Sequence, residues 1–157
     1  IVVSVFAREE AVNNLKKFIE SAGMELKILD YEVTTIINYG LYNKIATPFS
    51  VLYIDYGYVL LVTYSPLNVA YFVTHWDYTE YLKTGDEQSL ENFFAEIRNI
   101  LIINDLTNIY IAGPILSEEE LLTRVLENLP ILGLLDIEGL KPNFFIPYTL
   151  SLRGMEG

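Results

Sequence analysis

The sequence contains no cysteine and a single histidine among its 157 residues. Without cysteine, the chain can form no disulfide, no thiolate metal site and no thiol nucleophile. Because His75 is the only imidazole, zinc chemistry and histidine-based catalytic triads are excluded as well. We therefore expect neither a metal site nor a catalytic residue in this chain.

Basic residues are also scarce. Ten Lys and Arg stand against 21 Asp and Glu, which gives a formal net charge of -11. A surface of this sign does not neutralise phosphates, so nucleic acid is not an expected partner. Direct docking on anionic lipid is disfavoured for the same reason, and no run reaches the roughly 18 apolar residues that a membrane helix needs. We expect a soluble chain that does not insert into membranes.

The length and composition allow one well-packed core. With 52% hydrophobic residues, the chain is long enough for one domain or two small lobes. Ile1 opens directly into an apolar run, with no initiator Met and no signal-peptide pattern. We therefore expect the chain to be a fragment whose N-terminal part is missing.

The most informative stretch runs from Ser50 to Val73. Its apolar runs are 51–54, 58–63 and 69–73, and the turns between them contain Asp55, Gly57 and Ser65-Pro66-Leu67-Asn68. β-Branched and aromatic runs separated by short turns are typical of consecutive antiparallel strands. The stretch therefore predicts a three-strand antiparallel meander.

The first turn of this meander has two interpretations. In one, Asp55 caps backbone donors and Gly57 takes a positive φ in an ordinary tight turn. In the other, the turn is a phosphate loop, since backbone amides in a glycine turn can face an anion while an Asp beside them holds a hydrated metal. The residues of the stretch alone favour the ordinary turn.

The segment before the meander predicts a β-α-β unit followed by a connecting helix. The expected elements are a buried strand at 1–7, an amphipathic helix at 8–22 ended by Gly23, and a half-buried strand at 24–29. The apolar stripe of the helix is Ala11, Val12, Leu15, Phe18, Ile19 and Ala22. Asp30 then caps a helix to about Asn38, although the β-branched residues there would equally suit a strand. We expect a loop from Gly40 to Phe49.

The segment after the meander, from Thr74 to Gln88, is polar, aromatic and without a periodic pattern. We expect an exposed crossover, and its aromatic residues Trp76, Tyr78 and Tyr81 are candidates for binding a partner, because Tyr and Trp are favoured interface anchors. An alternative is that the aromatic pair beside His75 closes the edge of the sheet.

Helices and strands alternate in the C-terminal part. Ser89 to Ile102 predicts a helix whose buried stripe includes Phe93, Phe94 and Ile97. A strand is expected at 108–112, a capping box at 117–120 opening a helix with Leu121 and Leu126 in the core, a short strand at 130–135, and a last helix at 143–153. This order predicts a mixed sheet with helices on its faces.

Two of these segments resemble motifs of a known superfamily. V-L-Y-I-D-Y-G at 51–57 and I-Y-I-A-G-P at 109–114 resemble the second phosphate loop and the adenosine motif of the superfamily of actin, heat-shock chaperones and sugar kinases. A closer resemblance is to actin-like type IV pilus assembly proteins of the PilM kind, with the cell division protein FtsA and the secretion-system L proteins more distant. In the PilM kind, an apolar strand, a helix ending in Ala-Gly and a strand ending in Asp-x-Glu precede the Asp-x-Gly strand. The corresponding segments here are 1–7, 8–23 with Ala22-Gly23, and 26–32 with Asp30-Tyr31-Glu32, while 148–154 matches an ending in Leu-Arg-Gly.

The resemblance implies an actin-like, ribonuclease H-like α/β fold. Residues 1–49 would be part of a first lobe, with the β-α-β unit and connecting helix, and 50–157 the second lobe. It also implies a cytoplasmic protein that is peripheral to the inner membrane through its partners in a pilus or secretion complex. Self-association is kept as an alternative.

The nucleotide motifs depart from the family pattern. Asp55, Gly57 and Gly113 are the matching residues, but Gly57 is followed by Tyr58 rather than by a nearby Ser or Thr, and Gly113 stands alone before Pro114. The Pro adds bulk and removes an amide donor. We therefore expect a scaffold with a remnant nucleotide site and no cofactor. The alternatives are an ATPase that uses ATP and magnesium, and an acidic α/β domain of unrelated function.

Overall fold

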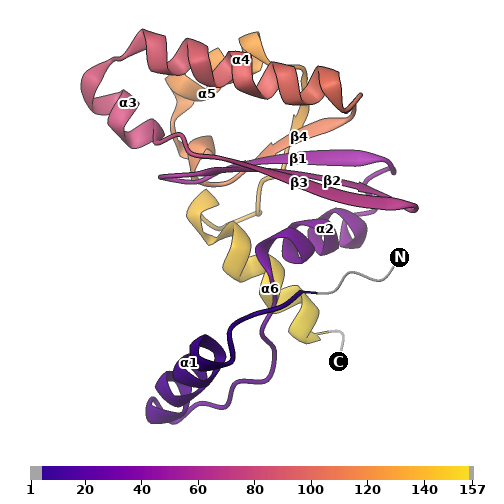
Figure 1. The fold of residues 1–157 in the computed structure, drawn as a ribbon, viewed down its shortest axis with the longest axis vertical. Helices are drawn as coiled ribbons and strands as arrows, with labels where there is room; N and C mark the ends of the chain where they lie inside the picture. Colours follow the sequence, from indigo (N-terminus) through magenta and orange to yellow (C-terminus); the bar gives the residue numbers. More distant parts are fainter. Residues whose placement is uncertain (1–4, 156–157) are drawn as a thin grey trace.

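The computed structural model describes residues 5–155, which form a three-layered body and an N-terminal arm (Figure 1). The strands are β1 (Phe49–Ile54), β2 (Val59–Ser65), β3 (Asn68–Thr74), β4 (Ile109–Ala112) and β5 (Ile131–Leu134), and the helices are α1 (Glu9–Ser21), α2 (Glu32–Tyr42), α3 (Tyr78–Thr84), α4 (Glu87–Ile103), α5 (Glu119–Asn128) and α6 (Phe145–Met155). None of the described helices is both long and apolar enough to cross a bilayer.

The five strands form one mixed sheet in the order β3-β2-β1-β4-β5. β1 pairs antiparallel with β2, and β2 pairs antiparallel with β3, while β1 and β4, and β4 and β5, are parallel neighbours. The apolar runs that we identified at 51–54, 58–63 and 69–73 fall on β1, β2 and β3, with Tyr58 just before β2. The chain is therefore an α/β protein with a mixed sheet.

One face of the sheet is covered by α3, α4 and α5 (Figure 1). Alternate residues of β1 point to this face, so Leu52 and Ile54 pack in the same core as Phe94 and Ile97 of α4. These side chains are at most 1% exposed. The expected helix over 89–102 and its inward-facing stripe are confirmed, and each such side chain contributes roughly 1.5–3 kcal/mol through its burial.

The opposite face is covered by α2 and α6, which lie below the sheet in Figure 1. Val51 and Tyr53 of β1 pack here with Ile36 of α2 and Phe145 of α6. The connecting segment after Asp30 is thus a helix rather than a strand, because its β-branched residues bury a helical face against the sheet. We assigned this helix to the first unit of the chain, and it packs on the sheet of the second.

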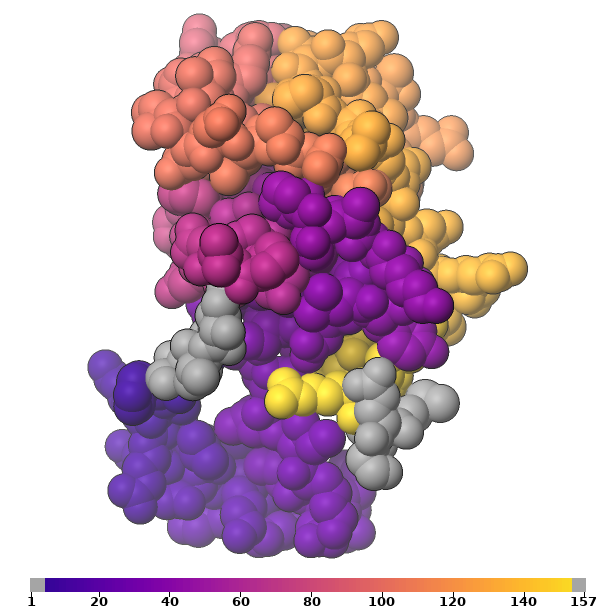
Figure 2. Space-filling model, turned by 90° about the vertical axis from the view of Figure 1, so that its right-hand side faces the viewer, coloured from indigo at the N-terminus to yellow at the C-terminus, as the bar shows by residue number. Residues whose placement is uncertain are grey.

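Residues 5–31 form the N-terminal arm, which projects from the body and carries α1 (Figures 1 and 2). The expected helix is present and ends at Ser21, two residues before Gly23, whose φ is +74°. Its apolar stripe is not buried, however, and Phe18 is 70% exposed. The strand expected at 24–29 is wrong, as is its partner at 5–7, while 1–4 lie outside the described residues. A strand needs a neighbour for its backbone groups, and none lies beside the arm in the described chain.

The start of α5 also differs from our expectation. Gly113 and Pro114 open a 3-10 turn that ends at Ser117, so Glu118 is the N-cap, and no side chain caps this helix. The predicted capping box, with Ser117 as the cap, is therefore wrong. Leu126, which we expected in the core, is 41% exposed. The buried stripe runs through Leu121, Val125 and Leu129, and each residue along a helix turns about 100° from the last.

Two leucine substitutions on α5 test this placement. We expect Leu121→Ala to lower the free energy of unfolding by about 2–5 kcal/mol, because the side chain is only 2% exposed and its loss leaves a cavity. Leu126→Ala should lower it by about 1 kcal/mol or less, since this side chain is half in solvent. Denaturant titration of both variants gives the comparison. A larger loss for Leu126→Ala would contradict the orientation of α5.

Candidate functional site

The carboxyl ends of β1 and β4 bring two of the predicted site residues together. Tyr53 of β1 is paired with Ala112 of β4, so Asp55 and Gly113 follow neighbouring ends of two parallel strands. This edge is where open α/β sheets usually bind ligands. Gly57 lies in the turn that leads from β1 to β2, and its surroundings are open. We call this group of residues the strand-end site.

Both carboxylate oxygens of Asp55 accept hydrogen bonds from the hairpin itself. The Tyr53 hydroxyl donates to Oδ2 at 2.9 Å, and the Tyr56 backbone N–H donates to Oδ1 at 2.7 Å. The Asp55 N–H in turn donates to the Tyr58 carbonyl at 3.0 Å and closes the turn. Asp55 therefore acts as the cap of an ordinary turn. The expected positive φ at Gly57 is wrong, because the left-handed glycines are at other positions.

The hydroxyls of Tyr53 and Tyr58 both donate to carboxylates, and that of Tyr58 links this hairpin to α2. The Tyr58 hydroxyl donates to Glu32 Oε1 at 2.8 Å, at the first residue of α2. Burial, followed by the charge of Asp55, raises the pKa of Tyr53 far above its usual range. Burial and the hydrogen bond to Glu32 do the same to the pKa of Tyr58. Both phenols thus stay protonated as donors to a carboxylate. Of the described His, Asp and Glu side chains, no three gather into a group that could hold a metal ion.

Gly113 is required by packing within the protein. Its φ of +101° and ψ of -176° belong to a backbone region that is essentially reserved for glycine. A Cβ atom at this position would lie 2.6 Å from the Ile54 carbonyl oxygen and 3.0 Å from the ring of Tyr53. The glycine therefore lets the loop after β4 lie against the end of β1, and its presence needs no bound ligand.

A pair of alanine substitutions separates the two glycines of the strand-end site. Gly113→Ala should destabilise the protein by about 1–3 kcal/mol from the backbone conformation alone, with the close contact to Ile54 adding to the loss. Gly57→Ala should change the stability by no more than about 0.5 kcal/mol, because nothing lies within 4 Å of its Cβ position. Thermal or chemical denaturation measures both. Equal effects would contradict this account of the loop.

The segment from Thr74 to Gln88 is not the exposed crossover that we expected. It contains α3, which begins because the Asp77 carboxylate accepts hydrogen bonds from the Thr79 and Glu80 amides, and ends at the left-handed Gly85. An Asp followed three residues later by Glu is a helix-start pattern, and this signal in the sequence could have identified the helix.

The aromatic residues of this segment are mostly interior. Trp76 and Tyr78 are 6% and 1% exposed, so the expectation that they are exposed partner anchors is wrong. Trp76 stacks on Phe93 with 4.0 Å between the ring centroids and donates its Nε1–H to Ser89 Oγ at 3.2 Å. Tyr81 is half-buried at the surface. Its hydroxyl donates to Glu87 and accepts from Arg124.

The hydroxyl of Tyr78 is buried without a hydrogen-bond partner among the described residues. Burial raises the pKa of this phenol, and the neighbouring Tyr56 phenol and Glu118 carboxylate act in the same direction. An unpaired buried hydroxyl reduces stability, because it has lost its hydrogen bonds to water and gained none in the protein.

Tyr78→Phe should therefore leave the stability unchanged or raise it, by about 1 kcal/mol at most, since the variant removes only the unpaired group. Tyr39→Phe is the matched control. The Tyr39 hydroxyl donates to the Asp136 carbonyl at 2.8 Å, so its loss should destabilise by about 1 kcal/mol. Urea titration compares the two variants. A clear loss of stability in Tyr78→Phe would show that its hydroxyl has a partner in solution.

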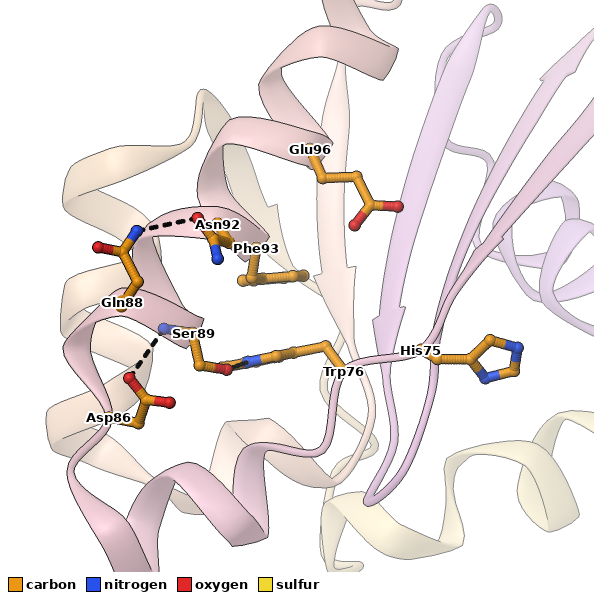
Figure 3. Close-up of a pocket in the computed structure, with 8 residues that line it drawn as sticks. All are labelled: His75, Trp76, Asp86, Gln88, Ser89, Asn92, Phe93 and Glu96. Carbon is orange, nitrogen blue, oxygen red and sulfur yellow. Dashed lines mark hydrogen bonds between the residues drawn. The ribbon is translucent and has the colours of Figure 1, made fainter.

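A polar pocket of about 280 Å³ lies beside α4, where the chain leaves β3 (Figure 3). It is lined by His75, Trp76, Asp86, Gln88, Ser89, Asn92, Phe93 and Glu96. Gln88, Asn92 and Glu96 are four residues apart and share one side of the helix. Figure 3 shows the imidazole of His75 directed away from them. Sequence reasoning did not identify this pocket, because its residues come from both ends of α3 and from α4.

A larger groove of about 970 Å³ separates the N-terminal arm from the body. Figure 2 shows the hollow between the arm, at the lower end of the view, and the strands above it. At this groove Asp30 forms an ion pair with Arg153 of α6, so two of the motif segments in the resemblance meet. Partial burial opposes ionisation of Asp30, but hydrogen bonds from Thr34 and Arg153 outweigh it and lower the pKa of the carboxyl.

Comparisons with known proteins give likenesses at the level of structure. The chain is similar to Pelota from Archaeoglobus fulgidus, with 17% sequence identity over 83% of this chain and 42% of that chain, and a TM-score of 0.39. The chain thus spans less than half the length of the protein that it matches. No protein-family model and no curated protein matches the sequence.

Proposed function

We propose that the chain is an actin-like scaffold domain whose nucleotide site no longer binds nucleotide. The strand order β3-β2-β1-β4-β5, with antiparallel pairing on one side of β1 and parallel pairing on the other, supports the actin-like, ribonuclease H-like fold that the motifs imply. Helices on both faces support it as well. The Asp-x-Gly turn and the glycine loop after β4 lie side by side, as two parts of a nucleotide cleft would.

The observation that carries the loss of nucleotide binding is the closure of the strand-end site by Tyr53. Its hydroxyl occupies Asp55 Oδ2, and its ring lies against the position where Gly113 has no side chain. A magnesium ion held by Asp55 would have to displace this phenol from a core where the side chain is 2% exposed. The space beside Gly113, where a nucleotide would lie, is already filled by the ring of Tyr53.

A scaffold acts through its surfaces, and the resemblance identifies the partners that we propose. These are proteins of a pilus or secretion complex at the inner membrane, with this domain on the cytoplasmic side and without a membrane segment of its own. The second candidate is an ATPase of the same superfamily. It is favoured by one observation, which is that Asp55 and Gly113 meet at the sheet edge where α/β proteins bind ligands.

Thermal melting with magnesium and ATP distinguishes these functions. A ligand at 100 times its dissociation constant stabilises a protein by about 2.7 kcal/mol, which is roughly 5 °C or more for a domain of this size. We expect a shift below about 1 °C with millimolar MgATP. The melt belongs on the full-length protein, so that both lobes of the cleft are present. A magnesium-dependent rise that Asp55→Ala abolishes would replace the scaffold by the ATPase.

A further inference from the structure

The outer edge of β3 is a free edge of the sheet. The strand is the first in the order β3-β2-β1-β4-β5, and among the described residues it pairs only with β2. In a hairpin with a two-residue turn, the pair that closes the turn is of the hydrogen-bonded kind, and the two kinds of pair alternate from there. Ser65 and Asn68 are the closing pair. The backbone groups of Val69, Tyr71 and Val73 therefore point away from β2, and no turn or loop hydrogen bond of the described chain uses them.

This edge lacks the features that keep sheet edges apart. Natural edge strands are usually very short, or they carry charged residues, prolines or bulges. β3 is seven residues long, contains no Asp, Glu, Lys, Arg or Pro, and keeps an unbroken register with β2. β5, at the opposite edge, has only four residues. The long, unprotected edge of β3 is therefore suited to pairing with a further strand.

The hairpin that carries this edge is also uncharged. From Tyr56 to Trp76, 21 consecutive residues include no Asp, Glu, Lys or Arg, which is the longest such run in a chain of net charge -11. Two copies of an acidic protein repel each other least where neither carries charge. A basic partner, in contrast, finds no carboxylate along this edge. The hairpin is thus a surface on which two copies of the chain can meet.

Apolar side chains are exposed along the same edge. Tyr71 and Val73 are 50% and 51% exposed, and Leu67 in the turn is 91% exposed. Tyr71 and Val73 lie on the face of the sheet that α2 and α6 cover, since residues two apart on a strand share a face and Val69 packs in that core. The groove between the N-terminal arm and the body is lined by residues of β3, so the arm leaves this edge accessible.

We propose that β3 pairs antiparallel with β3 of a second copy of the chain, about a two-fold axis at Tyr71. Tyr71 is the midpoint of Asn68–Thr74, so this register pairs all seven residues of the strand. It places Tyr71 opposite its own copy and Val69 opposite Val73, and these are the residues whose backbone groups point outward. Apolar cross-strand pairs of this kind stabilise a sheet. The two five-stranded sheets then form one continuous sheet.

The symmetry and the size of this contact determine its properties. A two-fold contact uses the same surface on both copies, so the assembly closes at the dimer and does not continue as a filament. A pair of seven-residue strands is smaller than a standard interface of about 800 Å² per partner, so the dimer dissociates on dilution. Because the contact contains no ion pair, salt should strengthen the dimer by screening the repulsion between two acidic copies.

Sedimentation velocity on the 157-residue protein, from about 1 to 200 μM, measures the equilibrium. We expect monomer and dimer alone, with more dimer at higher salt. Val73→Lys should weaken the dimer at least about tenfold, because it puts a charge on the paired edge. Leu132→Lys is the matched control on β5, where the side chain is 64% exposed, and its effect should be less than about twofold. Circular dichroism and thermal melting check that both variants fold. Monomer at every concentration, species larger than a dimer, or equal effects of the two variants would overturn the proposal.

Single cysteines test the register, since the chain has no cysteine of its own. Hydrogen-bonded partners in an antiparallel pair have Cα atoms about 5.5 Å apart, within the range of about 4.4–6.8 Å that a disulfide spans. Tyr71→Cys should therefore form a disulfide-linked dimer under mild oxidation. Leu67→Cys is the control. Its side chain is more exposed, but its two copies would be eight residues apart along the strands, roughly 27 Å. We expect Tyr71→Cys to cross-link at least about fivefold faster, and equal or faster cross-linking of Leu67→Cys would contradict the pairing.

Discussion

The structure depends on β1, which is buried on both faces and paired on both edges. Each of its six residues is at most 2% exposed. Its alternate side chains contribute to two separate cores, one under α4 and α5 and the other under α2 and α6. It also has an antiparallel neighbour on one side and a parallel neighbour on the other. A polar substitution in this strand would therefore disturb both layers and both halves of the sheet at once.

The same strand explains why the strand-end site is closed. Side chains two residues apart on a strand point to the same face, so the phenol of Tyr53 can reach the carboxylate of Asp55 just beyond the end of β1. The hydroxyl of Tyr53 therefore takes a hydrogen-bonding position on Asp55 that a ligand would otherwise use. The helices on the other face of the sheet lie in residues 77–128. Acidic side chains outnumber basic ones in this segment, so this layer of the protein is negatively charged.

Much of the body could be predicted from the sequence, because its elements carry their own periodic signals. The stripe of α4 and the apolar runs of β1 to β3 are such signals, and they depend on residues that are close together in the chain. The arm was mispredicted because a strand exists only beside another strand, whatever its own pattern is. The start of α5 was misplaced because Pro114 opens a turn that moves the helix beyond Ser117.

The candidate site was predictable only in part. The motifs identified Asp55 and Gly113 separately, and the parallel pairing of β1 with β4 brings them together. The role of Tyr53 depends on a side-chain contact, and the burial of Trp76 and Tyr78 depends on their packing in the core between α4 and the sheet. A polar and aromatic segment without periodicity gives no sign of such burial, since aromatic residues with polar tips are common both inside proteins and on their surfaces.

The mixed pairing of β1 also has a consequence for the order of folding. Its antiparallel partner follows within a few residues, so the hairpin of β1 and β2 closes a short loop and can form early. Its parallel partner is more than fifty residues further along the chain, beyond α3 and α4. The chain loses entropy when it closes that longer loop, before the contacts between β1 and β4 can form. Non-local pairing of this kind slows folding in proteins generally. During synthesis, β1 to β3 would therefore wait with the face that packs against α4 and the edge that pairs with β4 uncovered until those two elements emerge.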